Sequence, residues 1–176
     1  MAKISRLIVC DIDGVVADPG SRLAYLKNNE YDKFYGAEMA EDDWDEEMRE
    51  VLRLLYKQDN DWGRSDILFL TGRPLRTLEL TKLWLQNHIT PFVLGEDDAD
   101  NYHLVGRVDA DHRKSEVVKP ELLEKFLDRL IGEKIIDDGA EIFLFDDDPE
   151  NVVALENTLE KYRFKHKVFV VGTKRI

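Results

Sequence analysis

The feature that most constrains the fold of this chain is a regular alternation of short apolar runs with segments of helical periodicity. Largely apolar runs lie at 7–10, 67–70, 141–145 and 167–171, and 91–94 is a candidate for a fifth. Short, nearly continuous apolar runs are typical of strands that are buried on both faces of a parallel sheet.

The segments between these runs have apolar residues three or four positions apart, which predicts helices with one buried face. The stripes are Trp44, Met48, Val51, Leu52 and Leu55; Leu80, Leu83 and Trp84; Leu122, Leu123, Phe126, Leu127, Leu130 and Ile131; and Val152, Val153, Leu155, Leu159 and Tyr162. Pro120 and Pro149 are expected in the first turns of the last two helices. The alternation predicts an α/β fold, a Rossmann-like three-layer sandwich with a mainly parallel sheet and right-handed crossovers.

The length of 176 residues fits one domain, so residues 1–176 are expected to fold as a single unit. The segment 15–41 shows no clean period. Its aromatic residues predict either a flap over a site or ordinary surface packing; they are Tyr25, Tyr31, Phe34 and Tyr35.

Composition excludes some classes of protein. The chain has no apolar run long enough for a transmembrane helix, and its first residues do not have the pattern of a signal peptide. A single cysteine, Cys10, excludes an internal disulfide, so a cytoplasmic location is expected. The net charge of −12 disfavours extended nucleic-acid binding but allows one phosphate to bind through a metal ion. The acidic clusters 41–47 and 96–100 are expected to be a solvated helix face and a surface loop.

Polar side chains follow three of the expected strands, at the sheet edge where α/β proteins bind ligands. Asp11 and Asp13 follow the first strand, and two ionised carboxylates so close together repel each other unless a cation lies between them. Mg²⁺ takes oxygen ligands of this kind. Gly14 permits a tight turn after them. The alternative is a turn with two solvated aspartates.

The second and third strand ends are also candidate sites. Thr71, Gly72 and Arg73 offer a hydroxyl, backbone N–H groups and a guanidinium to phosphate oxygens, or alternatively form a turn with a helix cap. In the run 146–148, Asp148 has the form of an N-cap, and the remaining acidic pair needs a lysine or a metal as partner.

Two lysines, Lys119 and Lys114, are candidates for that basic partner. Lys119 is preferred because it stands at the start of the third helical stripe, which aims it at the carboxyl edge of the sheet. Either lysine could instead be an ordinary surface residue.

In this order, the four motifs resemble those of the haloacid dehalogenase superfamily of phosphohydrolases. The Asp-x-Asp motif is matched by Asp11 and Asp13, the hydroxyl motif by Thr71, the lysine motif by Lys119, and the acidic pair by Asp146 and Asp147. Within the superfamily, the chain is most similar to the 3′-phosphatase domain of polynucleotide kinase. That subgroup has an arginine after the first motif, a Thr/Ser-Gly-Arg motif and an Asp-x-Arg stretch, matched by Arg22, Thr71-Gly72-Arg73 and Asp111-His112-Arg113. Ser115 departs from the pattern, because the family can place an acidic residue there.

The resemblance implies a Mg²⁺-dependent phosphomonoesterase that works through an aspartyl-phosphate on Asp11. It implies that Asp13 is the general acid and base, that Thr71 and Lys119 hold the phosphoryl group, and that Asp146 orients Lys119. The implied metal ligands are Asp11, the backbone carbonyl of Asp13, and Asp147. The implied substrate-binding residues are Arg22, Gly72, Arg73 and Arg113.

The stretch between the first two strands leaves room for little or no cap domain, and an open site suits a DNA or RNA 3′ end or a nucleotide. The alternatives are a phosphatase of small molecules such as nucleotides or sugar phosphates and, more remotely, a non-catalytic binding module. No P-loop kinase motif is present. A separate kinase or ligase is therefore a candidate partner, and no membrane partner is expected.

Overall fold

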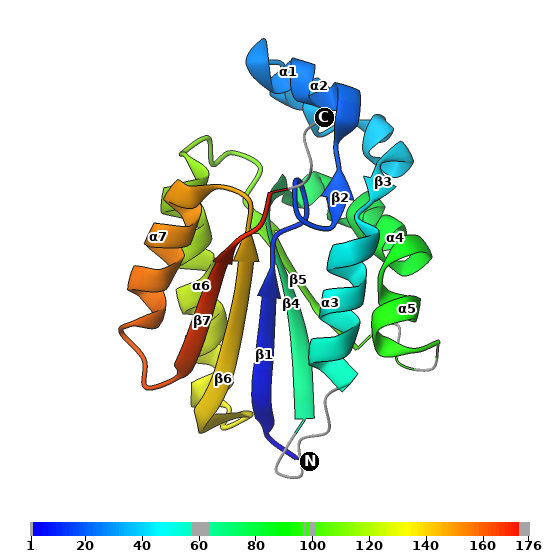
Figure 1. The fold of residues 1–176 in the computed structure, drawn as a ribbon. Coiled ribbons are helices and arrows are strands. Elements are labelled where there is room, and N and C mark those ends of the chain that lie inside the picture. Colours follow the sequence, from blue (N-terminus) through cyan, green and yellow to red (C-terminus); the bar gives the residue numbers. More distant parts are fainter. Residues whose placement is uncertain (1, 58–63, 97, 99–100, 173–176) are drawn as a thin grey trace.

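The structure is a computed structural model that describes residues 2–57, 64–96, 98 and 101–172. Within these residues the core is a five-stranded sheet with strand order β5-β4-β1-β6-β7 (Figure 1). The strands are β1 (Ile4–Cys10), β4 (Arg64–Pro74), β5 (His103–Arg107), β6 (Ile136–Asp146) and β7 (Lys165–Val170). Every neighbouring pair is parallel, which confirms the expected fold class.

The central strand β1 separates two hydrophobic cores. Successive side chains of a strand point to opposite faces of its sheet. Ile8 and Cys10 accordingly pack into one core, and Leu7 and Val9 pack into the other. This explains why the run 7–10 is apolar without alternation.

Helices cover both faces and complete the three layers (Figure 1). One core contains side chains from α3 (Glu46–Lys57), α4 (Leu78–His88) and α5 (Thr90–Leu94). The other contains side chains from α6 (Ser115–Gly132) and α7 (Pro149–Leu159). Pro149 occupies the first turn of α7, as expected, and the Asp148 side chain caps this helix by accepting from Glu150 N at 2.9 Å.

Short elements lie beyond the carboxyl edge of the sheet, at the top of Figure 1. They are β2 (Ala17–Asp18), η1 (Gly20–Arg22), α1 (Leu23–Lys27), α2 (Tyr31–Phe34), η2 (Ala37–Glu41) and β3 (Asp43–Trp44), and η3 (Leu75–Thr77) follows β4. β2 and β3 form a separate antiparallel pair. The whole segment between β1 and α3 is thus built from elements of two to five residues, and no cap domain is present among the described residues.

Two expectations about the elements were wrong. The run 91–94 lies in helix α5, because proline suits a first helical turn and Gly95, with φ of 102°, ends the helix. The fifth strand is β5 instead, an edge strand whose half-buried sequence HLVGR has no continuous apolar run. Pro120 lies in the second turn of α6 because this helix begins at Ser115, so Lys119 lies inside the helix.

The predicted helical stripes also include residues that lie outside the helices or are exposed. Trp44 belongs to β3, and Tyr162 lies beyond the end of α7. The outer members of the four stripes are exposed, because a helix that packs on a sheet from one side buries only its central rows. These exposed residues are Val51, Leu83, Ile131 and Val153.

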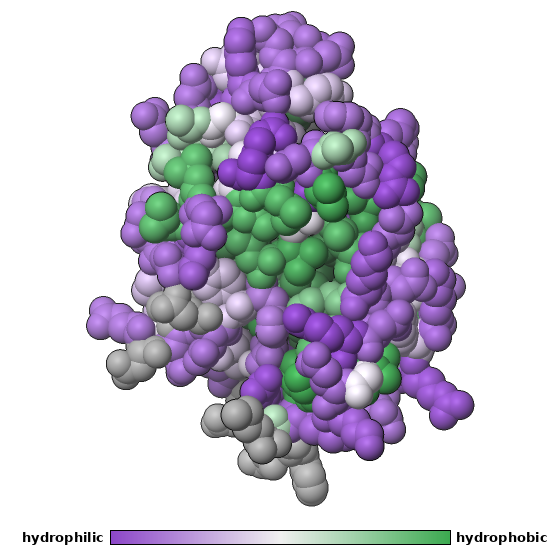
Figure 2. Space-filling view, turned by 180° about the vertical axis from the view of Figure 1, so that it is seen from behind, coloured by the Kyte–Doolittle hydropathy of each residue, from purple (hydrophilic) through white to green (hydrophobic). Residues whose placement is uncertain are grey.

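The surface shows both hydrophilic and hydrophobic areas. Seen from behind, hydrophobic side chains gather in the middle of the molecule and hydrophilic residues surround them (Figure 2). In the part of the chain that the structure covers, none of the helices has the length and apolar character needed to cross a membrane.

Candidate active site

A cavity of about 620 Å³ lies at the carboxyl edge of the sheet. Asp11 follows β1, Gly72 lies near the end of β4, and Asp147 follows β6, so parallel strands bring them to one edge. The cavity is lined by these three residues, by Asp13 and by Lys119. The outer wall includes Leu23 and Leu26 of α1 and Phe34 of α2. The segment 15–41 therefore covers part of the site, and its movement as a flap stays a prediction.

Lys119 joins two carboxylates at the floor of this cavity. Its Nζ lies 2.8 Å from Asp11 Oδ2 and 2.7 Å from Asp146 Oδ2, and all three residues are buried. Burial lowers the pKa of Lys119, but the two carboxylates outweigh this effect and raise the pKa above its ordinary value. Burial raises the pKa of Asp11 to about 8, although Lys119 acts in the opposite direction. The lysine is therefore fixed as a cation beside Asp11.

Asp146 is held in place by further contacts. Its Oδ1 accepts from the backbone N–H of Asp148 at 3.0 Å and from Asn151 Nδ2 at 2.9 Å. With Lys119 on Oδ2, both oxygens of Asp146 have protein donors. Its contacts are thus those of a residue that orients the lysine.

A cluster of acidic oxygens at the same edge is suited to a cation. One carboxylate oxygen from each of Asp11, Asp146 and Asp147 lies within 4.8 Å of the others, and Lys119 contacts the carboxylates of Asp11 and Asp146. Asn151 also lines the cavity, and its Oδ1 is buried without a hydrogen-bond donor among the described residues. Carboxylate oxygens close to one another and one unsatisfied amide oxygen are the kind of donors that a hard divalent cation takes.

Gly14 permits the close approach of Asp147. Its φ is +87°, and a Cβ at this position would lie 2.3 Å from Asp147 Oδ2. The turn itself closes on Ile12, whose carbonyl oxygen accepts from the N–H groups of Val15, Val16 and Ala17. Glycine is therefore needed here for its backbone angle and for its missing side chain.

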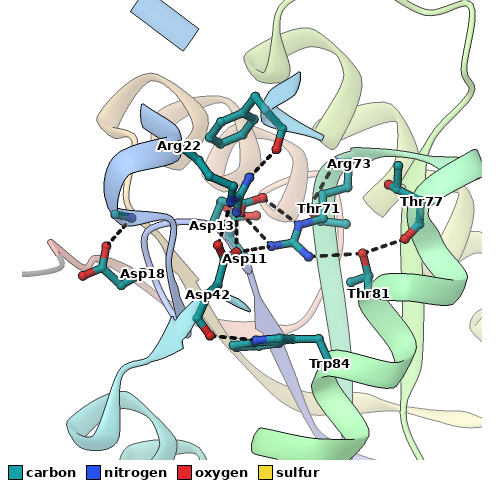
Figure 3. A network of polar contacts seen from close by, with 12 residues as sticks. Asp11, Asp13, Asp18, Arg22, Asp42, Thr71, Arg73, Thr77, Thr81 and Trp84 are labelled. Atoms are coloured by element: carbon teal, nitrogen blue, oxygen red, sulfur yellow. Dashed lines mark hydrogen bonds and ion pairs between the residues drawn. The ribbon is translucent and has the colours of Figure 1, made fainter. Parts of the chain in front are cut away.

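Asp13 belongs to a second, separate network, shown in Figure 3. Arg73 donates to it from Nε at 2.9 Å and from Nη2 at 2.7 Å, and Arg22 Nη2 lies 3.2 Å from its Oδ1. Burial raises the pKa of Asp13, but Arg73 and Arg22 outweigh this effect and hold the pKa below its ordinary value. Asp13 is therefore held in its ionised form.

Asp42 completes this network. Arg22 Nε donates to Asp42 Oδ1 at 2.6 Å, and Arg73 Nη2 lies 3.4 Å from Asp42 Oδ2. Trp84 Nε1 donates to the Asp42 backbone carbonyl at 2.9 Å. The expectation that the cluster 41–47 is a solvated helix face was wrong for Asp42, which is 7% exposed and precedes α3. Nothing in the sequence separates Asp42 from its acidic neighbours, because only the fold brings the two arginines to it.

The residues expected to bind substrate lie in three different settings: the cavity, a buried group of ion pairs, and the exposed surface. Gly72 lines the cavity. Arg22 and Arg73, expected at the substrate, are buried against Asp13 and Asp42, because a buried guanidinium needs opposite charges around it. Arg113 is exposed and pairs with Asp111 and Glu121 on the surface.

Thr71 and Lys114, two further candidates, lie at opposite extremes of exposure. Thr71 is 1% exposed, and its Oγ1 accepts from the backbone N–H of Arg73 at 3.2 Å. Lys114 has a highly exposed side chain 3.0 Å from Glu116. Lys119, and not Lys114, is the lysine at the strand ends.

Tyr35, one of the aromatic residues of the possible flap, lines the cavity, and Arg107, which the sequence analysis did not single out, lines a neighbouring cavity. Burial raises the pKa of Tyr35 to about 12, with the Asp13 carboxylate acting in the same direction. Arg107 ends β5, so it could not be placed while that strand was unassigned. The two aspartates differ in where they form ion pairs: Asp111 pairs on the surface, and Asp13 pairs inside the site.

A parallel three-layer fold with a carboxylate after its central strand, and a buried lysine between that carboxylate and another, is the arrangement expected of the phosphohydrolase superfamily that the sequence motifs resemble. Residues 5–155 match a family model described as "Polynucleotide kinase PNKP phosphatase domain". The match spans most of the chain. The chain therefore belongs to this family of phosphatases, and the match confirms the resemblance. A search of curated proteins found no match.

Proposed function

We propose that the protein is a Mg²⁺-dependent phosphomonoesterase that removes the 3′-phosphate from nucleic-acid ends or nucleotides. The observation that carries this proposal is the contact of Lys119 with both Asp11 and Asp146 on the floor of an open cavity. Membership of a phosphatase family supports the reaction class. The family description, which names a polynucleotide kinase, supports the choice of a nucleic-acid end or nucleotide as substrate.

In the first step, an oxygen of Asp11 attacks the phosphorus atom. The new oxygen–phosphorus bond forms as the bond to the leaving oxygen breaks, which gives an aspartyl-phosphate and splits the hydrolysis into two easier steps. Lys119 holds a phosphoryl oxygen and balances its charge. Asp146 keeps the ammonium in position through the 2.7 Å contact.

Asp13 moves the proton in both steps. The leaving oxygen receives a proton from Asp13 in the first step. In the second step, Asp13 takes a proton from a water molecule whose oxygen attacks the phosphorus atom, and the bond between phosphorus and Asp11 breaks, which releases inorganic phosphate and restores the Asp11 carboxylate. The paired arginines favour the ionised form, which suits the second step. In the first step, the negative charge of the bound phosphate opposes the arginines and raises the proton affinity of Asp13.

The residues that would hold Mg²⁺ are Asp11 and Asp147, and Asn151, whose Oδ1 has no hydrogen-bond donor among the described residues, lines the same cavity. Asp146 is a weaker candidate because Lys119, Asn151 and a backbone N–H already occupy its oxygens. The Asp13 carbonyl stays a prediction. When bound, the ion offsets the charge on the phosphoryl oxygens and lets an anionic nucleophile approach.

The test is phosphate release from a 3′-phosphorylated oligonucleotide, a 5′-phosphorylated one, and a panel of nucleotides and sugar phosphates, with Mg²⁺ and with EDTA. We expect release that depends on metal and favours the 3′-phosphorylated compounds. Asp11→Asn should abolish release while circular dichroism stays unchanged, because the amide cannot act as the nucleophile.

Each other outcome has a definite meaning. Release mainly from a sugar phosphate or a 5′-nucleotide would retain the reaction and discard the 3′-end substrate. Full activity in EDTA would remove the metal from the proposal. Substantial activity in Asp11→Asn would show that another group is the nucleophile.

A further inference from the structure

The active-site cavity has two chemically different sides. Its floor carries charged groups, which include Asp11, Asp13 and Lys119, whereas its outer wall carries apolar and aromatic side chains. The residues of the outer wall all come from the segment 15–41, and they are Pro19, Leu23, Leu26, Phe34 and Tyr35. The phosphate of a substrate contacts the floor, so the outer wall faces the group to which the phosphate is attached.

Tyr35 extends from the outer wall toward the strand ends. It directly follows helix α2, and its hydroxyl oxygen would lie 3.7 Å from a Cβ placed on Gly72, near the end of β4. Tyr35 and Leu26 line the active-site cavity and also a second cavity of about 480 Å³. The two side chains therefore lie where the cavities meet, and a leaving group that extends outward from Asp11 passes them.

The position of Tyr35 is fixed through its neighbour Phe34. The two rings pack edge-to-face, with their centroids 4.9 Å apart. The guanidinium of Arg22 lies over the Phe34 ring, 4.6 Å from its centroid, and donates to the Phe34 backbone carbonyl. Because Arg22 also pairs with Asp13 and Asp42, the aromatic wall is tied to the buried ion pairs of the site. A surface that is already ordered loses little conformational freedom when a ligand binds to it.

The ring of Tyr35 offers a flat, neutral surface close to the site of phosphate attack. Burial raises the pKa of Tyr35 to about 12, and the Asp13 carboxylate acts in the same direction. The side chain is therefore uncharged at neutral pH and does not repel an anionic phosphate beside it. Every nucleobase has a π face, so bases stack on such a ring whatever their sequence.

We propose, on the basis of the proposed function, that Tyr35 determines specificity for the leaving group by stacking on the base of a nucleotide whose phosphate lies at Asp11. Leu26 contributes apolar surface to the same subsite. The ligand of this subsite is a nucleobase, so the preferred leaving group is a nucleoside and not a free sugar. A sugar phosphate occupies the floor of the cavity but leaves the Tyr35 ring without a partner.

The experiment compares thymidine 3′-monophosphate with 1,2-dideoxyribose 3-phosphate, which has the same sugar and phosphate but no base. Phosphate release in Mg²⁺ gives kcat and KM for each compound. The wild-type protein is expected to prefer the thymidine compound by about tenfold or more in kcat/KM, which is the scale of stacking one base on one aromatic side chain. Tyr35→Ala should reduce the preference to about one. The change should appear in KM for the thymidine compound, because stacking contributes equally to ground-state and transition-state binding.

Three further variants control the result. Tyr35→Phe keeps the aromatic ring, so the preference should be retained. Tyr35→Leu keeps apolar bulk without a flat ring, so the preference should fall even if Tyr35→Ala is poorly folded. Tyr25→Ala removes a tyrosine from the same segment, one that contacts Glu38 on the surface and is not among the lining residues of either cavity, so the preference should stay unchanged.

The outcomes separate this inference from the proposed function. Equal kcat/KM for the two compounds in the wild type, or an unchanged preference in Tyr35→Ala, would overturn the base subsite and leave the phosphatase proposal intact. An equal loss for both compounds in Tyr35→Ala would show that Tyr35 only supports the cavity wall, and a lost preference in Tyr35→Phe would assign the effect to the hydroxyl; either result would overturn stacking. No release from either compound by the wild type would overturn both proposals.

Discussion

At the scale of single residues, the charge of Asp13 is balanced within a group of four ionised side chains. Two guanidinium groups and two carboxylates, Arg22, Arg73, Asp13 and Asp42, form one contiguous set of ion pairs, and Arg73 is fully buried (Figure 3). Removing one partner from a buried ion pair leaves an uncompensated charge, which costs more than the pair contributes. Asp42 is therefore expected to stabilise the fold through its ion pairs with the two arginines.

We expect Asp42→Asn to lower the free energy of unfolding by about 3 kcal/mol, because the two arginines would share a single carboxylate. Denaturant unfolding measures the effect. Asp43→Asn is the matched control, since the neighbouring Asp43 is exposed and should change stability little. If the two variants were equally stable, the four-residue group would not be a significant source of stability.

The sequence indicates the residue types of this group but not their pairing. Arg22 and Arg73 were singled out from motif positions alone, and a substrate was the natural partner to expect for them. Their carboxylate partners come from the turn after β1 and the segment before α3, and no local pattern connects these places. Lys119 and Asp146 were predictable as a pair because both follow from strand ends and a helical stripe that point to one edge.

At the scale of elements, the turn between β1 and β2 sets the position of the acidic cluster. We expect Gly14→Ala to displace the Asp147 carboxylate, because the new Cβ would overlap its Oδ2. The Mg²⁺ concentration that gives half-maximal phosphate release should rise by about tenfold, the scale on which groups that position a ligand act.

Gly20→Ala is the control for backbone strain. Gly20 also has a positive φ, of 48°, but a Cβ there would meet nothing within 4 Å. An equal rise in the Mg²⁺ requirement of both variants would attribute the effect to strain and not to the contact between Gly14 and Asp147.

The elements themselves were predictable where the sequence has a continuous apolar run or a helical stripe. The strands β1, β4, β6 and β7 and the four longer helices were found from apolar runs and stripes. β5 was missed because its sequence has no continuous apolar run and ends in Arg107, whereas β7, the other edge strand, has such a run although it is more exposed. The helix α5 was mistaken for a strand because periodicity does not separate a run of five residues from a buried strand.

At the scale of the whole molecule, the net charge of −12 opposes the approach of a polyanion. We expect kcat/KM for a 3′-phosphorylated oligonucleotide to rise by a factor of about two or more between low and physiological ionic strength, because salt screens this repulsion. The same measurement with thymidine 3′-monophosphate should change less. A steep fall with salt would instead indicate an extensive cationic surface of the kind that releases counterions on binding.

The central position of β1 has a consequence for how the enzyme can change. β1 pairs on both sides, with β4 and β6, and Asp11 N donates to Phe145 O at 2.9 Å. The outer wall of the cavity consists of helices of four or five residues, a length at which helices have little stability of their own. Substitutions in α1 and α2 therefore alter which leaving groups fit without moving the nucleophile, and new substrate ranges can evolve on an unchanged reaction.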